Sequence, residues 1–318
     1  MELLEVKDLK VYYYSNAGLV KAVDDVDFTL GKKHTLGIVG ESGSGKSTLG
    51  FSIMRLVPRP GRIVDGSIFF DQENLLSKSE QELRKIRGRR IGMVFQDPMT
   101  SLNPLMRVGH HIVETIMRHE TVTKEQAKKR AEALLEQLGI SMTRIDDYPH
   151  QFSGGMRQRI MIGLALALNP DIVIADEPTT SLDVIVEAQI VELMKQLKRD
   201  FESSMILITH NMGIVAELAD TVAVMYAGKI AEISDSISLY GKPLHPYTKA
   251  LLRSIPNIRL TSQELTFIPG LPPDLINPPR GCRFQPRCEY AMPRCVEEEP
   301  PLIKLEATRR VACFLYAG

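Results

Sequence analysis

The segment from Gly40 to Ser47 carries the clearest chemical pattern in the chain, because small and polar residues follow an apolar run from Thr35 to Val39 and precede a helix-compatible stretch. Glycines let a backbone curl until its N–H groups converge on an anion, a lysine can reach outer phosphates, and a serine hydroxyl can bind Mg²⁺. The pattern predicts a phosphate-binding loop that takes a nucleotide; an ordinary Gly/Ser turn is the disfavoured alternative. The residues expected to bind it are Gly40, Glu41, Ser42, Gly43, Ser44, Gly45, Lys46, Ser47 and Thr48.

Two acidic residues follow another apolar run. Ile172–Ala175 predicts a buried strand that delivers Asp176 and Glu177 at its end. Because adjacent strand residues point to opposite sides, Asp176 can face a metal ion while Glu177 orients or deprotonates an attacking water. Alone, such a pair is most simply a cap at a strand end. Beside a phosphate loop, it predicts Mg²⁺-dependent nucleotide hydrolysis.

A third polar cluster, Ser153, Gly154 and Gly155, precedes a helical pattern that runs from Arg157 to Leu168. Backbone N–H groups at a helix N-terminus form an anion site, so the cluster is a second candidate for phosphate binding. A simple helix cap is the alternative.

The elements that position these residues alternate between strands and helices. Apolar runs predict strands at 35–39, 91–95, 172–175, 205–209 and 222–226, and helical spacing covers Lys124–Leu138, with Gly139 as a C-cap. This is an α/β layout with a mostly parallel sheet. The segment Leu4–Leu30 alternates apolar and polar residues and predicts a small antiparallel β layer.

Charge and hydropathy exclude some function classes. The 318 residues include 39 basic and 39 acidic side chains, so no global field draws the chain to nucleic acid. No apolar run approaches the roughly 20 residues that span a bilayer, and the first residues lack a signal-peptide pattern. We therefore expect a cytoplasmic protein whose membrane role depends on a partner.

The last part of the chain, residues 241–318, is here called the tail. Twelve prolines between Pro243 and Pro301 exclude long regular elements, so a separate small unit is expected there. All four cysteines lie in it, and five, six and seventeen residues separate them. A reducing compartment disfavours disulfides, which leaves Zn²⁺, a [4Fe–4S] cluster or unliganded buried thiols. The cysteines are Cys282, Cys288, Cys295 and Cys313.

The order of these motifs resembles that of the ATP-binding-cassette (ABC) ATPase family over about residues 1–240. Gln96 matches the Q-loop, Ser181–Asp183 the D-loop and His210 the switch histidine. The segment 152–156 matches the family signature, but Phe152 and Met156 replace the usual leucine and glutamine. The resemblance implies a P-loop ATPase cassette at 1–240, with a helical subdomain at about 97–168.

The resemblance also implies a role for each matched residue. Two cassettes pair head to tail, and Ser153, Gly154 and Gly155 serve the nucleotide of the opposite cassette, next to Asp183 of the D-loop. Lys46 and the loop amides hold phosphate, Glu177 activates water, and His210 contacts the γ-phosphate region. Ser47, Gln96 and Asp176 organise Mg²⁺ directly or through water. Among Tyr12, Tyr13 and Tyr14, strand alternation selects Tyr13 for stacking on adenine.

The segment His245–Pro256 and the tail look like the oligopeptide/dipeptide-permease branch of ABC subunits. This resemblance implies an iron–sulfur cluster on the four cysteines. It also implies an importer with a second ATPase subunit, often a paralogue, two transmembrane permeases and an extracellular solute-binding protein, on the cytoplasmic face of the membrane. Peptides are the default solute, with oligosaccharides as a further possibility. The alternatives are a soluble cassette ATPase acting on nucleic acid or ribosomes, and a subunit that binds ATP without turnover.

Overall fold

The computed structural model describes residues 2–254 and 268–317, which form two compact units. The first comprises Met1–Leu76 and Ile208–Gly318, and the second comprises Ser77–Leu207. The predicted division into a cassette at 1–240 and a tail at 241–318 rests on the roles expected of these parts, and it stays a prediction. Ile255 and Pro256, the last two residues of the segment that resembles the permease branch, lie outside the described residues.

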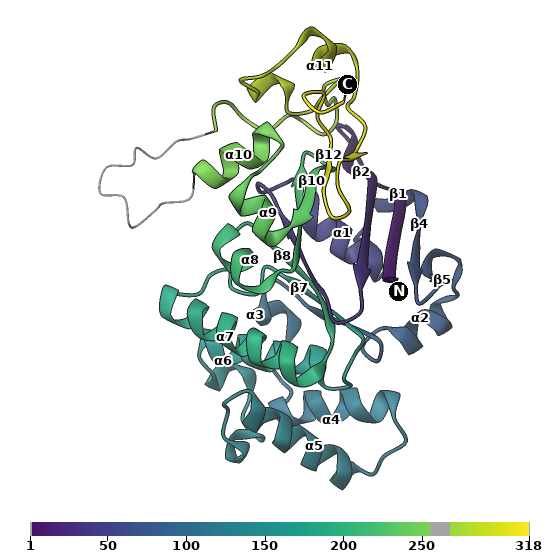
Figure 1. Ribbon diagram of the computed structural model, residues 1–318. Coiled ribbons are helices and arrows are strands. Elements are labelled where there is room, and N and C mark those ends of the chain that lie inside the picture. Colours follow the sequence, from purple (N-terminus) through teal and green to yellow (C-terminus); the bar gives the residue numbers. More distant parts are fainter. Residues whose placement is uncertain (1, 255–267, 318) are drawn as a thin grey trace. The chain divides into compact units, whose positions relative to one another are not determined.

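The first unit contains an antiparallel sheet whose strands lie in the order β2 (Gly18–Gly31), β1 (Glu2–Ser15), β4 (Gly61–Phe70) and β5 (Glu73–Asn74). Figure 1 shows β2, β1 and β4 side by side in purple and blue. Val6 of β1 lies opposite Phe28 of β2 and Ile68 of β4, and all three side chains are buried. The predicted antiparallel layer is therefore confirmed.

A second group of strands in this unit has the order β11 (Ile303–Lys304), β12 (Arg310–Val311), β10 (Lys229–Asp235), β9 (Thr221–Tyr226) and β3 (Thr35–Val39). β3 and β9 run parallel, and the other pairs are antiparallel. β12 of the tail pairs with β10 through Val311 and Glu232 (Figure 1). The tail therefore adds two short strands to the sheet that carries the phosphate loop.

Helices of the first unit are α1 (Lys46–Ile53), α8 (Met212–Leu218), α9 (Ser236–Gly241), α10 (Pro246–Arg253) and α11 (Pro293–Glu297), with a 3₁₀ turn η4 (Gln285–Arg287). Another 3₁₀ turn, η1 (Leu75–Ser77), lies at the boundary of the units. A Cβ on Gly37 of β3 would lie 2.6 Å from Cγ1 of Val215, so glycine is what lets α8 approach β3 closely. The ring of His245 caps α10, because its Nδ1 accepts the N–H of Tyr247 at 3.0 Å.

Three strands serve the second unit, in the order β8 (Ser204–Thr209), β7 (Ile172–Asp176) and β6 (Ile91–Val94); β8 continues past the unit boundary. β6 and β7 run parallel, with Ile91 opposite Ile172. These strands match the predicted runs to within a residue or two at each end. Every residue of β6, β7 and β8 is buried, which explains why the runs are apolar throughout rather than alternating.

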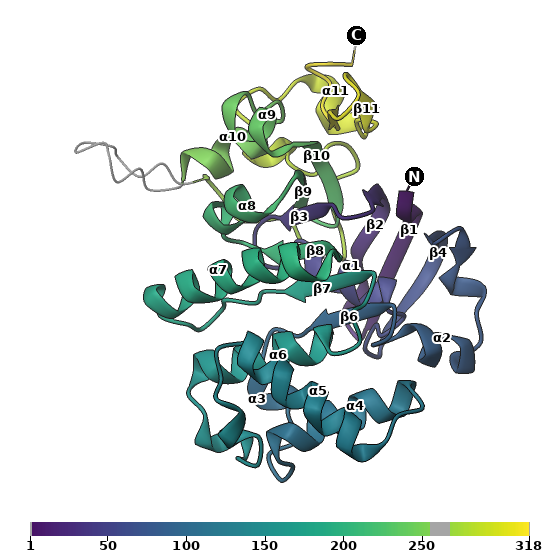
Figure 2. The ribbon, with the colours of Figure 1, turned by 60° about the horizontal axis from the view of Figure 1, so that its bottom comes forward.

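The helices of the second unit are α2 (Glu80–Ile86), α3 (Pro98–Ser101), α4 (Val108–His119), α5 (Lys124–Gln137), α6 (Gly154–Leu166) and α7 (Val184–Phe201), with 3₁₀ turns η2 (Met142–Arg144) and η3 (Pro149–Gln151). α4 and α5 pack side by side (Figure 2). Gly139 takes a φ of 70° just past the end of α5, as the sequence predicts. Thr123 and Gln126 form a capping box at the start of this helix. In the part of the chain that the structure describes, no helix combines the length and apolarity that a membrane crossing requires.

Candidate functional site

The phosphate loop connects β3 to α1 in the first unit, and two of its glycines lie against neighbouring backbone. A Cβ on Gly40 would lie 2.1 Å from the carbonyl oxygen of Met225, and one on Gly45 would lie 2.0 Å from that of Ala22. Their φ angles are 154° and 101°, so both position and conformation demand glycine. At Gly43, by contrast, a Cβ would meet no atom of the described residues within 4 Å, so the loop is open on that side.

Lys46 is 6% exposed, and its Nζ donates to the carbonyl oxygens of Gly40 and Glu41 at 2.9 and 3.0 Å. The Oγ of Ser44 is buried and has no hydrogen-bond partner among the described residues. The Lys46 ammonium within the loop and the unsatisfied Ser44 hydroxyl both suit a polyanion on the open side of the loop. The loop geometry therefore fits the nucleotide that the sequence predicts.

The three neighbouring tyrosines have different surroundings. Tyr12 donates its hydroxyl to Asp24 at 2.6 Å, and Tyr14 is exposed with the guanidinium of Arg62 over its ring. Tyr13 is half-buried, and its hydroxyl lies 3.3 Å from the Oγ1 of Thr48 in α1. The hydroxyl of Tyr13 thus contacts the helix of the phosphate loop, and its stacking role stays a prediction.

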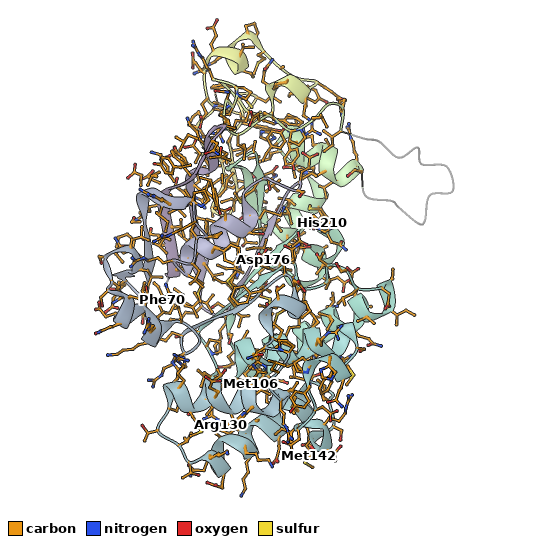
Figure 3. All side chains as sticks on the ribbon, turned by 180° about the vertical axis from the view of Figure 1, so that it is seen from behind. Phe70, Met106, Arg130, Met142, Asp176 and His210 are labelled. Atoms are coloured by element: carbon orange, nitrogen blue, oxygen red, sulfur yellow. The ribbon has the colours of Figure 1, made fainter. Side chains whose placement is uncertain are left out.

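In the second unit, β7 ends at Asp176 (labelled in Figure 3), which is 1% exposed. Glu177 comes just after the strand in the left-handed region, with a φ of 49°. Strand alternation therefore does not aim its side chain, contrary to the reasoning from sequence. The hydroxyl of Thr180 donates to the Glu177 carboxylate at 2.9 Å and fixes its direction instead. A strained φ at a non-glycine residue is frequent in functional sites.

Gln96 and His210 each follow a strand, as the sequence predicts. Gln96 is exposed two residues after β6 in the second unit. His210 is exposed directly after β8, in the first unit (Figure 3). The next residue, Asn211, caps α8 by accepting from the N–H groups of Gly213 and Ile214 at 2.9 and 3.4 Å. Each residue therefore occupies a chain position that its predicted role requires, and the roles themselves stay predictions.

The signature segment begins α6, and its serine is the N-cap. Ser153 accepts from the N–H of Met156 at 3.4 Å. A Cβ on Gly155 would lie 2.4 Å from Cγ1 of Val186, whereas one on Gly154 would meet only Leu182 at 3.9 Å. Gly155 is therefore required by packing within the second unit, and Gly154 is not.

The two departures from the usual signature share one neighbour. The ring of Phe152 is 3% exposed, with the guanidinium of Arg144 4.1 Å from its centre. The same guanidinium lies 3.6 Å from the sulfur of Met156. Arg144 thus packs against both substituted side chains, which gives the altered helix entry a structural basis.

Asp183 of the predicted D-loop caps α7. Its carboxylate accepts from the N–H groups of Ile185 and Val186 at 3.1 and 3.0 Å. A carboxylate at a helix N-terminus is also stabilised by the helix dipole. The residue therefore has a structural role within the second unit in addition to the role that the family resemblance implies.

Comparisons with known proteins agree with this geometry. The family described as ABC transporter matches residues 23–180, and the family described as oligopeptide/dipeptide transporter, C-terminal region, matches residues 231–295. The oligopeptide transport ATP-binding protein OppD of Bacillus subtilis is 52% identical over 98% of this chain and 88% of its own length. The chain belongs to the oligopeptide/dipeptide branch of ABC transporter ATP-binding subunits. This ABC ATPase hydrolyses ATP.

Further relatives place the similarity across nearly the whole chain. The dipeptide transport ATP-binding protein DppD of Bacillus subtilis is 48% identical over 99% of this ABC ATPase and 95% of its own length. Among solved structures, a dimeric post-hydrolysis ATP-binding cassette bound to ADP and Pi gives a TM-score of 0.66 at 26% identity. That match covers 73% of this chain and 98% of the other.

The predicted metal centre in the tail is wrong. All four cysteines lie within the described ranges, 2–254 and 268–317, where no group of three or more His, Cys, Asp or Glu side chains could hold a metal ion. Burial raises the pKa of Cys282 to about 11 and also raises the pKa of Cys288 and of Cys313, so these thiols keep their protons at neutral pH. Neither a [4Fe–4S] cluster nor Zn²⁺ is supported. The four cysteines form no disulfide; Cys295 is buried, and Cys282, Cys288 and Cys313 are partly exposed.

The tail is held by ion pairs that the sequence does not reveal. Arg283 is 6% exposed and pairs with Asp24, and it also donates to the carbonyl oxygen of Ala227. Arg287 pairs with Glu41 of the phosphate loop at 2.7 Å. The two pairs join residues 259 and 246 positions apart, so no local pattern could have indicated them.

Proposed function

We propose that this chain is one of the two cassette subunits of an importer for oligopeptides, dipeptides or a related solute. ATP binding closes a head-to-tail pair of cassettes, and hydrolysis resets it. The observation that carries the proposal is an open phosphate loop in a chain whose tail matches the oligopeptide/dipeptide transporter family. The relatives' printed names, oligopeptide and dipeptide transport ATP-binding proteins, support peptides as the solute.

Each residue of the nucleotide site has a role in this proposal. The amides from Gly40 to Thr48 and the Nζ of Lys46 bind phosphate oxygens, and Tyr13 stacks on the adenine. Glu177 accepts a proton from the attacking water, and the Thr180 hydroxyl keeps its carboxylate oriented. His210 contacts the γ-phosphate region. The two remaining groups of residues, Ser153, Gly154 and Gly155 of the signature and Asp183 of the D-loop, act on the partner's nucleotide.

Magnesium is the expected cofactor of this reaction. When bound, Mg²⁺ neutralises charge that develops on the phosphate oxygens. Ser47 offers a hydroxyl, Asp176 a carboxylate and Gln96 an amide oxygen, which are ligand types that this hard cation prefers. These side chains would hold the ion directly or through water.

The proposed partners are a second cassette subunit, often a paralogue, two transmembrane permeases and, through these, an extracellular solute-binding protein. We assign the permease contact to the residues after Gln96, from Asp97 to Pro104. Within the second unit, the adjoining Leu105 is 86% exposed and lies on a cavity of about 540 Å³ together with Met106. An exposed apolar side chain beside a cavity suits the end of a partner's helix. The chain is accordingly placed at the cytoplasmic face of the membrane.

The decisive experiment compares wild type and Glu177→Gln in the transporter assembled in vesicles. If Glu177 is the general base, hydrolysis falls by about 10²- to 10⁴-fold while ATP binding persists. Glu192→Gln, in an exposed pair with Lys195 on α7, is the matched control and keeps wild-type turnover. Turnover that survives Glu177→Gln would refute the catalytic assignment. ATP-driven uptake of a labelled peptide of two to five residues, against a labelled oligosaccharide, tests the solute.

A further inference from the structure

The tail reaches into the phosphate loop at Glu41, the second residue of that loop. The guanidinium of Arg287 donates two hydrogen bonds to the Glu41 carboxylate, from Nη1 at 2.7 Å and from Nη2 at 3.0 Å. Arg287 lies at the end of η4 and is only 7% exposed. A bidentate pair of this kind fixes direction as well as charge.

A second contact from the tail fixes the backbone of the same residue. The N–H of Glu41 donates to the hydroxyl of Tyr247 at 2.9 Å. Tyr247 belongs to α10, is fully buried, and packs against Tyr226 and Phe284 with ring centres 4.5 and 5.3 Å apart. Burial raises the pKa of Tyr247, so its hydroxyl stays neutral and can accept this bond at any physiological pH.

Arg287 is itself held in place from several directions. It donates to the carbonyl oxygens of Pro269 and Ile268 at 2.9 and 3.3 Å and to the hydroxyl of Tyr226 at 3.2 Å. Burial acts to lower the pKa of Arg287, but the bonds to Glu41 and Tyr226 outweigh it and raise the pKa above its ordinary value. The guanidinium is therefore a fixed, permanently charged group.

Glu41 in turn positions the cation of the loop. Its carbonyl oxygen accepts from the Nζ of Lys46 at 3.0 Å and from the N–H of Ser44 at 3.2 Å. The contacts that hold Glu41 thus also hold the oxygen on which Lys46 rests. A loop that is ordered before the nucleotide arrives loses less entropy on binding.

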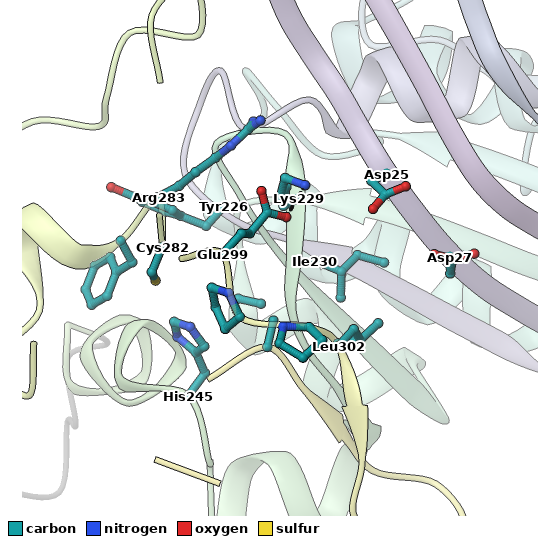
Figure 4. A pocket seen from close by; sticks show the side chains of 15 residues that line it. Asp25, Asp27, Tyr226, Lys229, Ile230, His245, Cys282, Arg283, Glu299 and Leu302 are labelled. Atoms are coloured by element: carbon teal, nitrogen blue, oxygen red, sulfur yellow. Dashed lines mark ion pairs between the residues drawn. The ribbon is translucent and has the colours of Figure 1, made fainter. Parts of the chain in front are cut away.

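A parallel route runs through Arg283, on the wall of a cavity of about 270 Å³ that Cys282 and Tyr226 also line (Figure 4). Arg283 donates to the carbonyl oxygen of Ala227, and the next residue, Gly228, donates its N–H to the carbonyl oxygen of Ser44 at 2.9 Å. The tail therefore supports the phosphate loop at two of its residues, Glu41 and Ser44.

We propose that the tail sets the ATP affinity of this subunit, with Arg287 and Tyr247 as positioning residues that order the phosphate loop and neutralise the Glu41 carboxylate beside it. The inference rests on the nucleotide-binding loop of the proposed function. ATP is a polyanion, and an uncompensated carboxylate within its binding loop repels it.

The test measures displacement of the fluorescent analogue TNP-ATP by Mg-ATP on the full chain, and KM and kcat for ATP in the assembled transporter. Arg287→Met is expected to raise the Kd and KM for ATP about tenfold and to leave kcat within twofold. Arg287→Lys, which keeps the charge, is expected to raise the Kd about threefold. The matched control is Arg294→Met, since Arg294 pairs with Glu298 on the exposed surface of the same tail, and its Kd stays within twofold of wild type.

Rescue separates this role from a merely structural one. In the double variant Glu41→Gln/Arg287→Met no uncompensated carboxylate remains, so its Kd should return to within threefold of wild type. An unchanged Kd for ATP in a folded Arg287→Met protein would overturn the proposal. So would a double variant that binds ATP as weakly as Arg287→Met, or an Arg287→Lys variant that binds it as weakly as Arg287→Met. If Arg287→Met does not fold, Tyr247→Phe decides, because it removes only the hydroxyl that accepts from Glu41; about threefold weaker binding supports the inference and unchanged binding refutes it.

Lys46→Ala keeps the two proposals distinguishable. It must abolish TNP-ATP binding if the phosphate loop is the nucleotide site, whatever Arg287 does. Retained binding in Lys46→Ala contradicts the proposed function. Lost binding in Lys46→Ala together with wild-type affinity in Arg287→Met contradicts only the role of the tail.

Discussion

Replacing Arg283 by methionine should release the tail, because its partner Asp24 cannot be left unpaired at low cost. Asp24 is 8% exposed, and one carboxylate oxygen accepts from the Tyr12 hydroxyl at 2.6 Å while the other accepts from Arg283. The variant removes the buried ion pair and leaves the neutral Tyr12 hydroxyl as a donor to the carboxylate. Methionine fills much of the volume of the arginine stem, so the change tests charge more than packing.

The expected cost follows from the burial of the pair. Breaking a buried ion pair by removing one partner costs about 3–5 kcal/mol, and the surviving bond from Tyr12 places this case near about 3 kcal/mol. That value corresponds to about a 100-fold rise in the undocked fraction of the tail. The paired variant Asp24→Asn/Arg283→Met leaves no buried charge and should recover most of the loss.

The sign of the pH dependence gives a further check. Burial acts to raise the pKa of Asp24, but the Tyr12 hydrogen bond and Arg283 outweigh it, so its pKa lies below the ordinary value. Its stabilising contribution is therefore present above the unfolded-state pKa of about 3.9 and is lost as the pH falls. Arg283→Met removes one of the groups that lower the pKa of Asp24, so the difference in stability between wild type and variant should narrow as the pH falls.

Hydrogen–deuterium exchange of amides in the described part of the tail measures the opening directly. Arg283→Met should speed exchange there by about 100-fold, whereas the exposed pair in Arg294→Met should change it by less than about threefold. Exchange in Arg283→Met that equals wild type within threefold would refute the reasoning. So would a paired variant that exchanges as fast as the single one.

Two further predictions concern packing and protonation. Gly155→Ala should lower the stability of the second unit by about 1–3 kcal/mol, because its Cβ would lie 2.4 Å from Val186, whereas Gly154→Ala has its nearest contact at 3.9 Å and should cost nothing; equal melting temperatures of the two variants would contradict this. Burial lowers the pKa of His245 to about 4, so the unfolded chain binds the extra proton first and stability should fall by up to about 3 kcal/mol between pH 6.5 and 4. Urea unfolding between pH 6.5 and 4 measures this fall, and His245→Gln should make the free energy of unfolding less dependent on pH. An equally steep pH dependence in the variant would show that other groups cause it.

The parts of the fold that the sequence predicts well are those in which one residue type serves one local purpose. Strands such as β3 and β7 are buried throughout, so a continuous apolar run identifies them. Gly40 and Gly45 are required by backbone oxygens about 2 Å from where a Cβ would be, which is why the phosphate loop has a readable pattern. Local sequence was sufficient because the constraint itself is local.

The directions of the functional side chains are harder to predict from the sequence. Glu177 lies beyond its strand with a φ of 49°, so strand alternation does not set the direction of its side chain, and the hydroxyl of Thr180 holds the carboxylate. Asp183 matches the D-loop motif in sequence, and in the structure it also caps α7. The order of motifs in the sequence identifies these residues, but backbone turns and caps decide where their side chains point.

The error in the tail has a physical origin. Four clustered cysteines in a proline-rich segment suggested that a metal had to stabilise a unit with little regular structure. The structure instead distributes that task over two buried arginines, a buried aromatic group around Phe284 and a strand that pairs with β10. Arginine is common enough that Arg283 and Arg287 stand out only once Asp24 and Glu41 are seen beside them. Because one of those carboxylates belongs to the phosphate loop, the contacts that replace the expected metal also connect the tail to the nucleotide site, and that connection gives the tail a means to influence ATP binding.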